Sequence, residues 1–295
     1  MTTVVVAILT YLRPEGLRRT VAAVLEQIGD VGDAAVLVID NDPAGSAAAA
    51  AADLGPPEHV RVVHEPTPGI VAARNRALDE SGHADVLVFI DDDELPEPGW
   101  LRSMVGTWEH TRAAAVAGPV ISTFAEEPDP FIVSGAFFVR RRLPTGTALT
   151  IAASGNLLLD LAQIRQAGVR FDDRFAMSGG SDSLFTRELH QRGLRMVWCD
   201  DAPVHDVVPA SRANRRWVLQ RAVRSGNAAS RIEIILAGSP LARVVARGRC
   251  FGRGLVRVVG GAARVGLGTV SRCLVHRARG ARTLARGAGM VAGVA

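Results

Sequence analysis

The sequence contains no lysine. All 34 of its basic residues are arginine, and with 30 acids they give a formal net charge of +4. Cysteine is scarce as well, because the three thiols at Cys199, Cys250 and Cys273 lie far apart without metal-ligand spacing. This usage excludes a disulfide framework and predicts free thiols in a reducing, cytoplasmic setting.

Long uncharged runs are also missing from residues 234–295. No stretch there approaches the roughly 18 to 20 uncharged residues that a membrane-spanning helix needs. The opening segment MTTVVVAIL has no basic part and no small-residue cleavage pattern, so it predicts a first strand rather than a signal peptide. With 48% hydrophobic residues among 295, the chain can bury a sizeable core, which argues against disorder as its dominant state.

The charge is unevenly distributed along the chain. Residues 234–295 hold 11 arginines and no acid, whereas the remainder holds 23 arginines and 30 acids, a formal charge of −7. On one ideal helix, nine of the tail arginines would share an arc of about 120°. They are Arg243, Arg247, Arg253, Arg257, Arg264, Arg272, Arg279, Arg282 and Arg286. The pattern predicts a basic amphipathic tail lying on an anionic membrane surface, and its many glycines predict a broken helix. The alternative is a flexible tail that binds nucleic acid or nothing.

The first 120 residues alternate between strand-like and helix-like segments. Apolar runs lie at 4–9, 36–39, 60–63 and 86–90. Helix-like segments separate them at 14–27, 47–54 and 69–78. This alternation predicts βαβ units with right-handed crossovers and a parallel sheet.

The periodicity weakens over 122–153, which predicts irregular connections and short strands of the kind found in variable substrate loops. Order returns over 154–168, and a glycine-rich turn then opens a predicted helix within 178–193. A strand at 195–199 and a helix at 211–229 complete the predicted elements.

Four acids, Asp91 to Glu94, directly follow the apolar strand at 86–90. Ligands of open α/β sheets bind at the carboxyl ends of strands. Carboxylates crowded there repel one another unless a cation or a donor-rich ligand compensates them. The alternative is a solvated turn that caps the next helix.

An ordered set of motifs resembles the family 2 inverting glycosyltransferases with the GT-A fold over roughly residues 4 to 230. In chain order they are AILTYLRP, VLVIDND, PGIVAARNRAL, VFIDDDELPEPGWL, ASGNLLLD and SGGSDSLFTRELHQRG. The resemblance implies an α/β fold, with a Rossmann-like, mainly parallel sheet flanked by helices. It implies a glycosyltransferase domain at 1–233, with a nucleotide-binding part to about 120 and an acceptor part from 121. Residues 234–295 then form a separate basic amphipathic helical tail.

The resemblance also implies a nucleotide-sugar donor, a UDP-sugar, together with Mg²⁺ or Mn²⁺ on its diphosphate. Asp93 would be the metal ligand, joined by His205, although a lone histidine can also be just a satisfied polar group. Asp91 would face the ribose or the donor sugar. Asp92 belongs to the same donor motif and is expected to turn toward the protein.

Further donor contacts follow from the same motifs. The residues implied are Thr10, Tyr11, Arg13, Asp40, Arg74 and Asn156. The loop at 10–13 would run beside the base, Asp40 would accept hydrogen bonds from the base or ribose, and Arg74 would bind a base edge or a phosphate. Asp40 can instead form a turn, and Arg74 can instead pair with Asp79 or Glu80 on its own helix.

Asp182 is the implied catalytic base, because inversion needs one carboxylate to accept the proton of the attacking hydroxyl. The chain departs from the family pattern at Ser181, where an acid usually precedes the base. Ser181 and Asp182 also fit a helix start with an acid in its first turn. The next candidates for the base are Asp172, Asp173 and Glu188.

The sequence thus predicts a cytoplasmic, metal-dependent inverting glycosyltransferase, peripheral on the inner face of the cell membrane. Its acceptor would be a hydroxyl of a glycan, a lipid-linked sugar or a small molecule in cell-envelope or polysaccharide synthesis, and no nucleic acid is expected. A sugar nucleotidyltransferase is the rival enzyme, but it would need a glycine-rich phosphate loop after strand one and usually a lysine. The other rival is a non-catalytic protein that docks on membranes or nucleic acid through the arginine tail.

Overall fold

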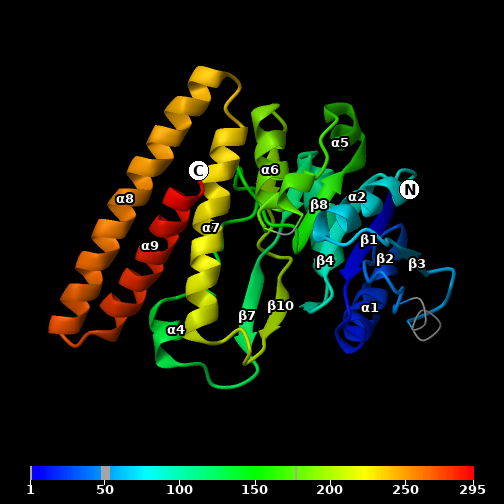
Figure 1. Cartoon of the computed structure of the whole chain (residues 1–295). Coiled ribbons are helices and arrows are strands. Elements are labelled where there is room, and N and C mark those ends of the chain that lie inside the picture. The colour runs from blue at the N-terminus through cyan, green and yellow to red at the C-terminus, as the bar shows by residue number, and fades with distance from the viewer. Residues whose placement is uncertain (1, 48–53, 177) are drawn as a thin grey trace. The chain divides into compact units, whose positions relative to one another are not determined.

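The computed structural model describes residues 2–47, 54–176 and 178–295 (Figure 1). Within these ranges the apolar runs form a seven-stranded sheet of order β3-β2-β1-β4-β8-β6-β9. The strands are β1 (Thr3–Thr10), β2 (Asp33–Asp40), β3 (Val60–His64), β4 (Val86–Asp91), β6 (Ala115–Ala117), β8 (Asn156–Asp160) and β9 (Met196–Trp198). The helix predicted at 47–54 lies almost wholly outside the described residues.

The strand register places the polar strand ends together. β3, β2, β1 and β4 are mutually parallel, with Thr10 beside Asp40 and Leu9 beside Asp91. β8 runs antiparallel to β4, so its first residue, Asn156, pairs with Ile90 at the same edge. Because parallel strands end at one edge, the motifs predicted from separate segments meet there.

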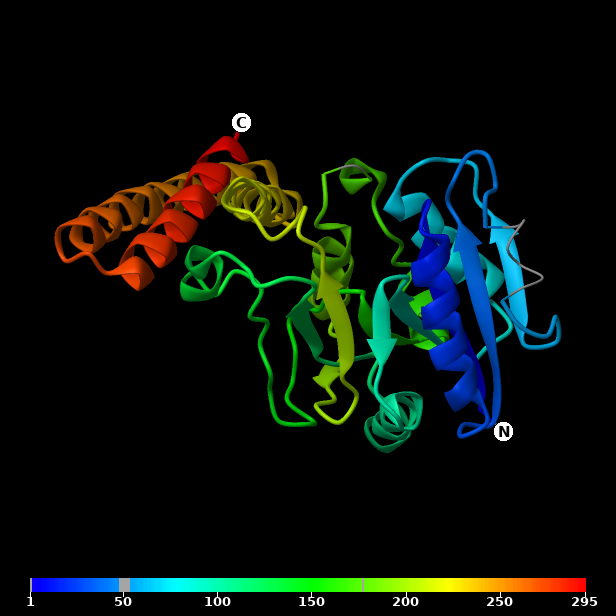
Figure 2. The same cartoon turned by 90° about the horizontal axis from the view of Figure 1, so that it is seen from below.

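Both faces of the sheet are covered by helices, which is why its strands are almost entirely apolar. Alternate residues of each strand point to opposite faces and enter two separate hydrophobic cores. One core includes α1 (Pro14–Ile28) and α3 (Trp100–Thr111), and Figure 2 shows α1 in dark blue running along β1 and β2. The other core includes α2 (Ile70–Glu80), α5 (Leu161–Ala167) and α6 (Ser181–Gln191). The predicted α/β fold with a mainly parallel sheet is confirmed.

The chain divides into two compact units. The first, here the sheet unit, comprises residues 1–121, 140–177 and 181–206. The second, here the helical unit, comprises residues 122–139, 178–180 and 207–295. The boundary predicted at residue 233 falls inside α7 (Arg215–Ile235), and this helix groups with the tail.

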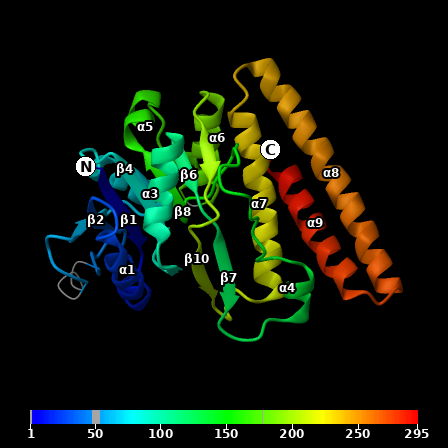
Figure 3. The ribbon, with the colours of Figure 1, turned by 180° about the vertical axis from the view of Figure 1, so that it is seen from behind.

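Three long helices build the helical unit, in which α7, α8 (Pro240–Val270) and α9 (Leu274–Ala292) lie side by side (Figure 3). The short helix α4 (Pro130–Ser134) packs against α9 and α7.

A three-stranded sheet of order β5-β10-β7 is formed by β5 (Glu94–Pro96), β10 (Val204–Val208) and β7 (Val120–Phe124). A 3₁₀ turn, η2, covers Asp173–Phe175.

The prediction that glycine breaks the tail helix is wrong. α8 is continuous over 31 residues, because three of its glycines, seven residues apart, face α9. A Cβ on Gly261 would lie 2.5 Å from the main-chain nitrogen of Leu284, and one on Gly268 would lie 2.6 Å from that of Arg277. Gly254 meets the main-chain oxygen of Gly287 in the same way. Close packing of the two backbones therefore offsets the low helix propensity of glycine.

The single helical arc predicted for the nine tail arginines is also wrong. α8 ends at Val270 and α9 starts at Leu274, so the tail is a hairpin of two helices rather than one. The turn between them reverses the chain direction. Arginines that would share one face of a straight helix are thereby divided between two helices that face each other.

Candidate active site

Asp92 connects the end of β4 to the loop after β1. Its carboxylate accepts hydrogen bonds from Thr10 Oγ1 at 2.8 Å and from Arg13 Nη1 at 2.9 Å. Its main-chain oxygen accepts another from Thr20 Oγ1. Burial raises the pKa of Asp92, and the bonds from Thr10 and Arg13 oppose that shift. The Asp92 carboxylate thus points into the protein. We therefore expect Asp92 to influence donor binding indirectly, by fixing the loop after β1.

Asp91, which is partly buried, and Glu94, which is fully buried, form an acidic pair at the same strand end. The backbone nitrogen of Asp91 lies 3.3 Å from Glu94 Oε2. Burial, opposed by the positive charge of Arg74 and assisted by the negative charges of Asp93 and Asp92, raises the pKa of Asp91 to about 6. Burial and then the charge of Asp91 raise the pKa of Glu94 well above its usual range. Gly155 leaves room for this pair, because a Cβ there would lie 2.9 Å from Asp91 Oδ2 and from Glu94 Oε1.

Asp93 is more accessible than Asp92, with 34% of its side chain exposed against 7%. It pairs with Arg13 Nη1 at 2.6 Å. His205 lies in β10, where its Nε2 is 2.5 Å from Glu97 Oε1. Among the described residues, no three His, Cys, Asp or Glu side chains form a cluster that could hold a metal ion by themselves. A cation here would need donor oxygens in addition to the protein, so the metal roles of Asp93 and His205 stay predictions.

The loop after β1 has an unusual backbone and exposes large apolar side chains. Leu12 adopts a left-handed φ of 55°, a conformation that is uncommon for residues other than glycine. The Tyr11 and Leu12 side chains are more than half exposed. Arg13 follows and precedes the first turn of α1. Exposed apolar surface beside strand-end carboxylates suits the flat face of a nucleotide base.

Asp40 is fully buried and closes the loop after β2. Its carboxylate accepts hydrogen bonds from the backbone nitrogens of Asp42 at 3.1 Å and Ala47 at 2.6 Å. The turn-forming alternative is therefore observed, and the nucleotide role of Asp40 stays a prediction. Asn41 connects this loop to α2, because its Oδ1 accepts from Gly69 N and its Nδ2 donates to two main-chain oxygens after β3.

Arg74 joins the acidic strand end to the start of α6. Its Nη1 donates to Ser181 Oγ at 2.7 Å, and its guanidinium lies 5.3 Å from the centre of the Phe171 ring. α6 begins at Ser181, so Asp182 lies in the first helical turn, where main-chain amides stabilise an anion. The Asp182 carboxylate accepts from Ser183 N at 2.7 Å. The structure thus brings the segments of Asp91, Arg74 and Asp182 together from three separate elements.

The alternative pairing of Arg74 within its own helix is not found among the described residues. Asp79 instead forms an ion pair with Arg170, and Glu80 forms ion pairs with Arg61 and Arg76. The guanidinium of Arg74 is therefore directed to the site rather than to the surface of α2.

Asn156 is fixed by its own hydrogen bonds. Its Oδ1 accepts from Trp100 Nε1 at 2.9 Å, and its Nδ2 donates to the main-chain oxygens of Pro119 and Ala202. Only 2% of the residue is exposed. The role of Asn156 in binding the nucleotide-sugar donor stays a prediction. Its hydrogen bonds fix the start of β8 beside β4.

Sequence reasoning missed Arg140, Asp206 and Gly155. Arg140 pairs with Asp206 at 2.9 Å and lies 3.9 Å from Glu94, so it places positive charge beside the acidic pair. Arg140 lies in the irregular segment 122–153. The sequence of this segment has no clear periodicity, so it did not predict where Arg140 lies in the fold. Gly155 could have been suspected, because a glycine that directly precedes a buried strand often marks a close approach.

Comparison with solved structures defines the class of the fold. The chain matches a crystal structure of GalNAc-T7 with UDP, GalNAc and Mn²⁺ at a TM-score of 0.59, with 13% identity over 81% of this chain and 48% of that chain. It matches S. aureus TarS at 0.52, with 14% identity over 84% of this chain and 42% of that chain. The chain therefore spans less than half the length of these neighbours. At such identities the likeness shows the fold alone, which is the GT-A type.

Sequence comparison then gives the family. Residues 5–160 match the profile of glycosyl transferase family 2. The succinoglycan biosynthesis protein ExoM of Rhizobium meliloti (strain 1021) is 32% identical over 229 residues, which cover 77% of this chain and 74% of that protein. The pre-mycofactocin glycosyltransferase of Mycobacterium tuberculosis (strain ATCC 25618 / H37Rv) is 29% identical over 205 residues, 66% of this chain and 41% of that protein. The chain belongs to glycosyl transferase family 2 and is a glycosyltransferase.

Proposed function

We propose that this glycosyltransferase moves a sugar from a nucleotide diphosphate donor, a UDP-sugar, to a hydroxyl acceptor with inversion at the anomeric carbon. The observation that carries the proposal is the junction made by Arg74. This side chain bonds the start of α6, where Asp182 lies, and its charge acts on Asp91 at the end of β4. A donor motif and a base motif that lie far apart in sequence thereby share one site.

The donor nucleotide would bind along the carboxyl edge of the sheet. Tyr11 and Leu12 offer exposed apolar surface to a base, and Asp40 closes the neighbouring loop. Arg74 can present its guanidinium fork to a phosphate or a base edge. Asp91 lies next to Gly155 and is influenced by the charge of Arg74, and it would bind the hydroxyls of ribose or sugar.

The strand-end acids fit a divalent cation on the diphosphate. Burial and neighbouring negative charge raise the pKa of Asp91 despite Arg74, so the nearby arginines do not fully compensate the negative charge of the strand end. Asp93, with its partly exposed carboxylate, would be the main protein ligand, and His205 the second. Mg²⁺ or Mn²⁺ bound there would neutralise charge that develops on the leaving diphosphate. The crystal structure of GalNAc-T7 with UDP and Mn²⁺ supports this choice by fold likeness.

Asp182 would act as the base. Its carboxylate sits in the first turn of α6 and is oriented by the amide of Ser183. Accepting the proton of the acceptor hydroxyl strengthens that oxygen as a nucleophile as it attacks opposite the leaving diphosphate. One base on the acceptor side is sufficient for inversion.

We further propose that the acceptor is a glycan of polysaccharide or cell-envelope synthesis. The support is the 32% identity with a succinoglycan biosynthesis protein along most of both chains. A precise sugar or linkage depends on a few pocket contacts, which differ between enzymes of one fold.

The tail supports peripheral binding to an anionic membrane, on the inner face of the cell membrane. Within residues 2–47, 54–176 and 178–295, no helix combines the length and apolar character that a bilayer crossing requires. Large apolar side chains of α8 are nevertheless exposed, on the side opposite the glycines that face α9. This outer stripe consists of Leu241, Val244, Val245, Phe251, Leu255, Val256, Val259, Leu267 and Val270. An exposed apolar stripe beside many arginines suits the interface of an anionic bilayer.

The metal-dependent donor site is tested by Asp93→Asn. The variant keeps the shape of the side chain but loses its charge, so we expect transfer and metal-dependent donor binding to be lost, as they should be in excess chelator. The measurements are release of nucleoside diphosphate and the thermal shift given by UDP-sugars with and without Mn²⁺.

Asp33→Asn is the matched control, because Asp33 is an exposed acid at the amino end of β2. It therefore lies at the opposite end of the strands from the proposed donor site. We expect near-normal activity from it. Full activity of Asp93→Asn, or of the native enzyme in excess chelator, would overturn the metal assignment.

A further inference from the structure

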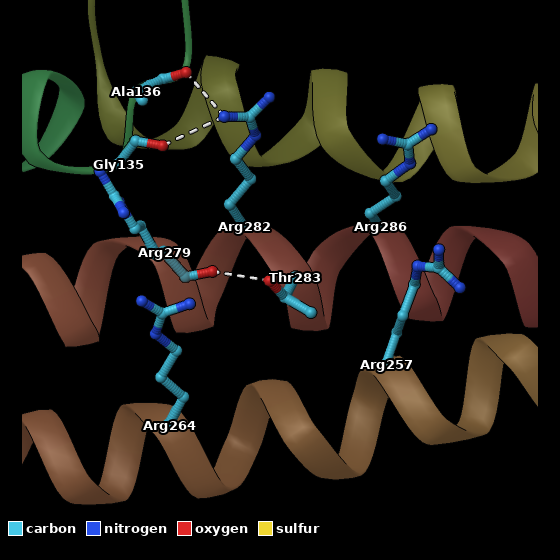
Figure 4. A pocket seen from close by; sticks show the side chains of 8 residues that line it. All are labelled: Gly135, Ala136, Arg257, Arg264, Arg279, Arg282, Thr283 and Arg286. Carbon is cyan, nitrogen blue, oxygen red and sulfur yellow. Dashed lines mark hydrogen bonds between the residues drawn. The ribbon is translucent and has the colours of Figure 1, made fainter.

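Five arginine side chains surround one cavity in the helical unit. Arg257 and Arg264 come from α8, and Arg279, Arg282 and Arg286 come from α9 (Figure 4). The remaining lining residues are Gly135, Ala136 and Thr283, and the cavity has a volume of about 370 Å³. This volume falls within the range of small-molecule pockets. We call these five arginines and their cavity the arginine pocket.

The positive charge of the pocket has no acidic partner. The helical unit holds 17 arginines and only four acids, a formal charge of +13. Glu233 pairs with Arg249 and Arg253, and Asp129 pairs with Arg215. Among the described residues, no carboxylate forms a salt bridge with any of the five pocket arginines. The cationic groups therefore face one another without compensation, which is unfavourable unless an anion joins them.

Arg282 is held in place at the centre of this charge. Its Nη1 donates to the main-chain oxygens of Ala136 at 2.6 Å and Gly135 at 3.2 Å, as Figure 4 shows. Its guanidinium also lies 5.7 Å from the centre of the Phe137 ring. Burial and the charges of Arg286 and Arg279 lower the pKa of Arg282. The protein thus orients a guanidinium at an energetic cost that a bound anion would offset.

We propose that the arginine pocket is a binding site for a ligand that carries a diphosphate group. Arginine forks match phosphate oxygens in pairs, and the lining combines five guanidinium groups with no aromatic or large aliphatic side chain, so the recognised part is the phosphate rather than a base or a sugar ring. One phosphate ester carries roughly two negative charges, too few for five guanidinium groups on two facing helices. A diphosphate supplies oxygens to both helices. The site is separate from the proposed donor site, whose residues all belong to the sheet unit.

The test compares two double variants of the full chain in chelator, which suppresses metal-dependent binding at the donor site. Arg264→Gln with Arg279→Gln removes two pocket cations, and neither guanidinium donates a hydrogen bond to another described residue. Arg247→Gln with Arg224→Gln removes the same charge from exposed positions of α8 and α7 outside the pocket. The probe is inorganic pyrophosphate, with affinity measured by calorimetry and by thermal shift.

We expect saturable pyrophosphate binding to the native chain, a loss of affinity of about tenfold or more in the pocket variant, and less than about a twofold change in the control variant. Equal affinities of the two variants, or no pyrophosphate binding to the native chain, would overturn the proposal. Stronger binding of single-stranded nucleic acid than of pyrophosphate, lost in the pocket variant, would overturn it too, because the ligand would then be a polyanion of another class.

Vesicles distinguish a lipid source of the diphosphate from a soluble one. The native chain is mixed with vesicles that contain diacylglycerol pyrophosphate and with phosphatidylserine vesicles of matched surface charge. A preference for the former that pyrophosphate abolishes supports a lipid headgroup as the ligand. Equal binding to both vesicles, together with tight binding of free pyrophosphate at the pocket, supports a soluble diphosphate. Both outcomes retain the site.

Discussion

Individual side chains of the site have distinct tasks although the sequence presents them as one acidic run. Asp92 turns inward to bind Thr10 and Arg13, whereas Asp93 keeps a third of its side chain exposed. Asp91 is partly buried beside Glu94, in space that exists only because residue 155 is glycine. Asp91 ends β4, whereas Asp92 and Asp93 form the turn to β5, so the turn rather than strand alternation directs their side chains.

At the residue scale, the proposed base is tested by Asp182→Asn. The amide can still accept the hydrogen bond from Ser183 N but cannot take up a proton, so we expect kcat to fall by roughly 10²- to 10⁴-fold. Donor affinity should change little, because Asp182 acts on the acceptor. Steady-state kinetics with a donor and acceptor pair, and donor titration of the variant, provide the two readouts.

Asp173→Asn and Glu188→Gln are the comparisons for Asp182, since both acids lie close to it in the chain. Asp173 is in the 3₁₀ turn η2, and Glu188 is on α6 beyond the first turn. We expect both variants to retain most of the activity. Should one of them lose turnover while Asp182→Asn keeps it, the base lies at that residue.

At the scale of secondary-structure elements, glycine spacing decides how the tail folds. Gly254, Gly261 and Gly268 repeat every seven residues on α8 and face α9. Gly254 lies against Gly287, Gly261 against Gly280, and Gly268 against Arg277. A heptad spacing returns to nearly the same side of a helix, so the two backbones stay close along their length. The glycines at 248, 252, 260 and 266 have nothing within 4 Å and take no part in this contact.

Gly261→Ala tests this close packing. The added Cβ would meet the main chain of Leu284 at 2.5 to 2.8 Å, and backbone atoms cannot move aside without shifting the helix. We expect the free energy of unfolding to fall by about 1 to 3 kcal/mol, the usual effect of overpacking. Denaturant unfolding followed by circular dichroism measures the change.

Gly260→Ala is a matched control one residue away on the same helix. Its Cβ would enter open space, so alanine should gain helix propensity and raise the free energy of unfolding by up to about 1 kcal/mol. Opposite signs for neighbouring glycines would establish the α8 and α9 contact. The same sign for both substitutions would contradict it.

At the scale of the whole molecule, charge separates the two units. The helical unit has a formal charge of +13, and the sheet unit, with 17 arginines and 26 acids, has −9. An anionic surface therefore attracts one unit and repels the other, with each charge contributing roughly 1 kcal/mol close to the surface. We expect the full chain to bind anionic vesicles, to be released in part by salt, and to bind neutral vesicles less.

Val256→Asp tests the contribution of the outer stripe of α8 to this binding. Val256 is 73% exposed, and an aspartate there would place a negative charge in the apolar face that enters the interface. We expect the fraction that sediments with anionic vesicles to fall several-fold at fixed lipid. Val139→Asp is the control, because Val139 is 72% exposed and lies outside α8. Both substitutions thus replace an equally exposed valine by an aspartate. Equal losses in the two variants would show that the stripe does not contact lipid.

Local patterns in the sequence determined the α/β architecture and much of the site. The strands predicted at 4–9, 36–39, 60–63 and 86–90 correspond to β1, β2, β3 and β4. Their ends agree within one residue, except that β2 starts three residues earlier than predicted. Buried parallel strands are apolar on both faces and end in turns, so their positions are written in short stretches of chain. The sequence also predicted that Asp40 and Asp91 lie at the ends of buried strands, where ligands of open α/β sheets bind.

Only the tertiary structure decided which side chains meet. The bond from Arg74 to Ser181 joins residues 107 positions apart, and the space beside Gly155 depends on β8 running antiparallel to β4. The tail shows the same limit. An ideal helix placed nine arginines on one face, but a turn after Val270 folds that face onto itself and makes a pocket from five of them. Hydrophobic periodicity predicts which side of a helix or strand is buried. Which other element packs against that side depends on where the chain turns.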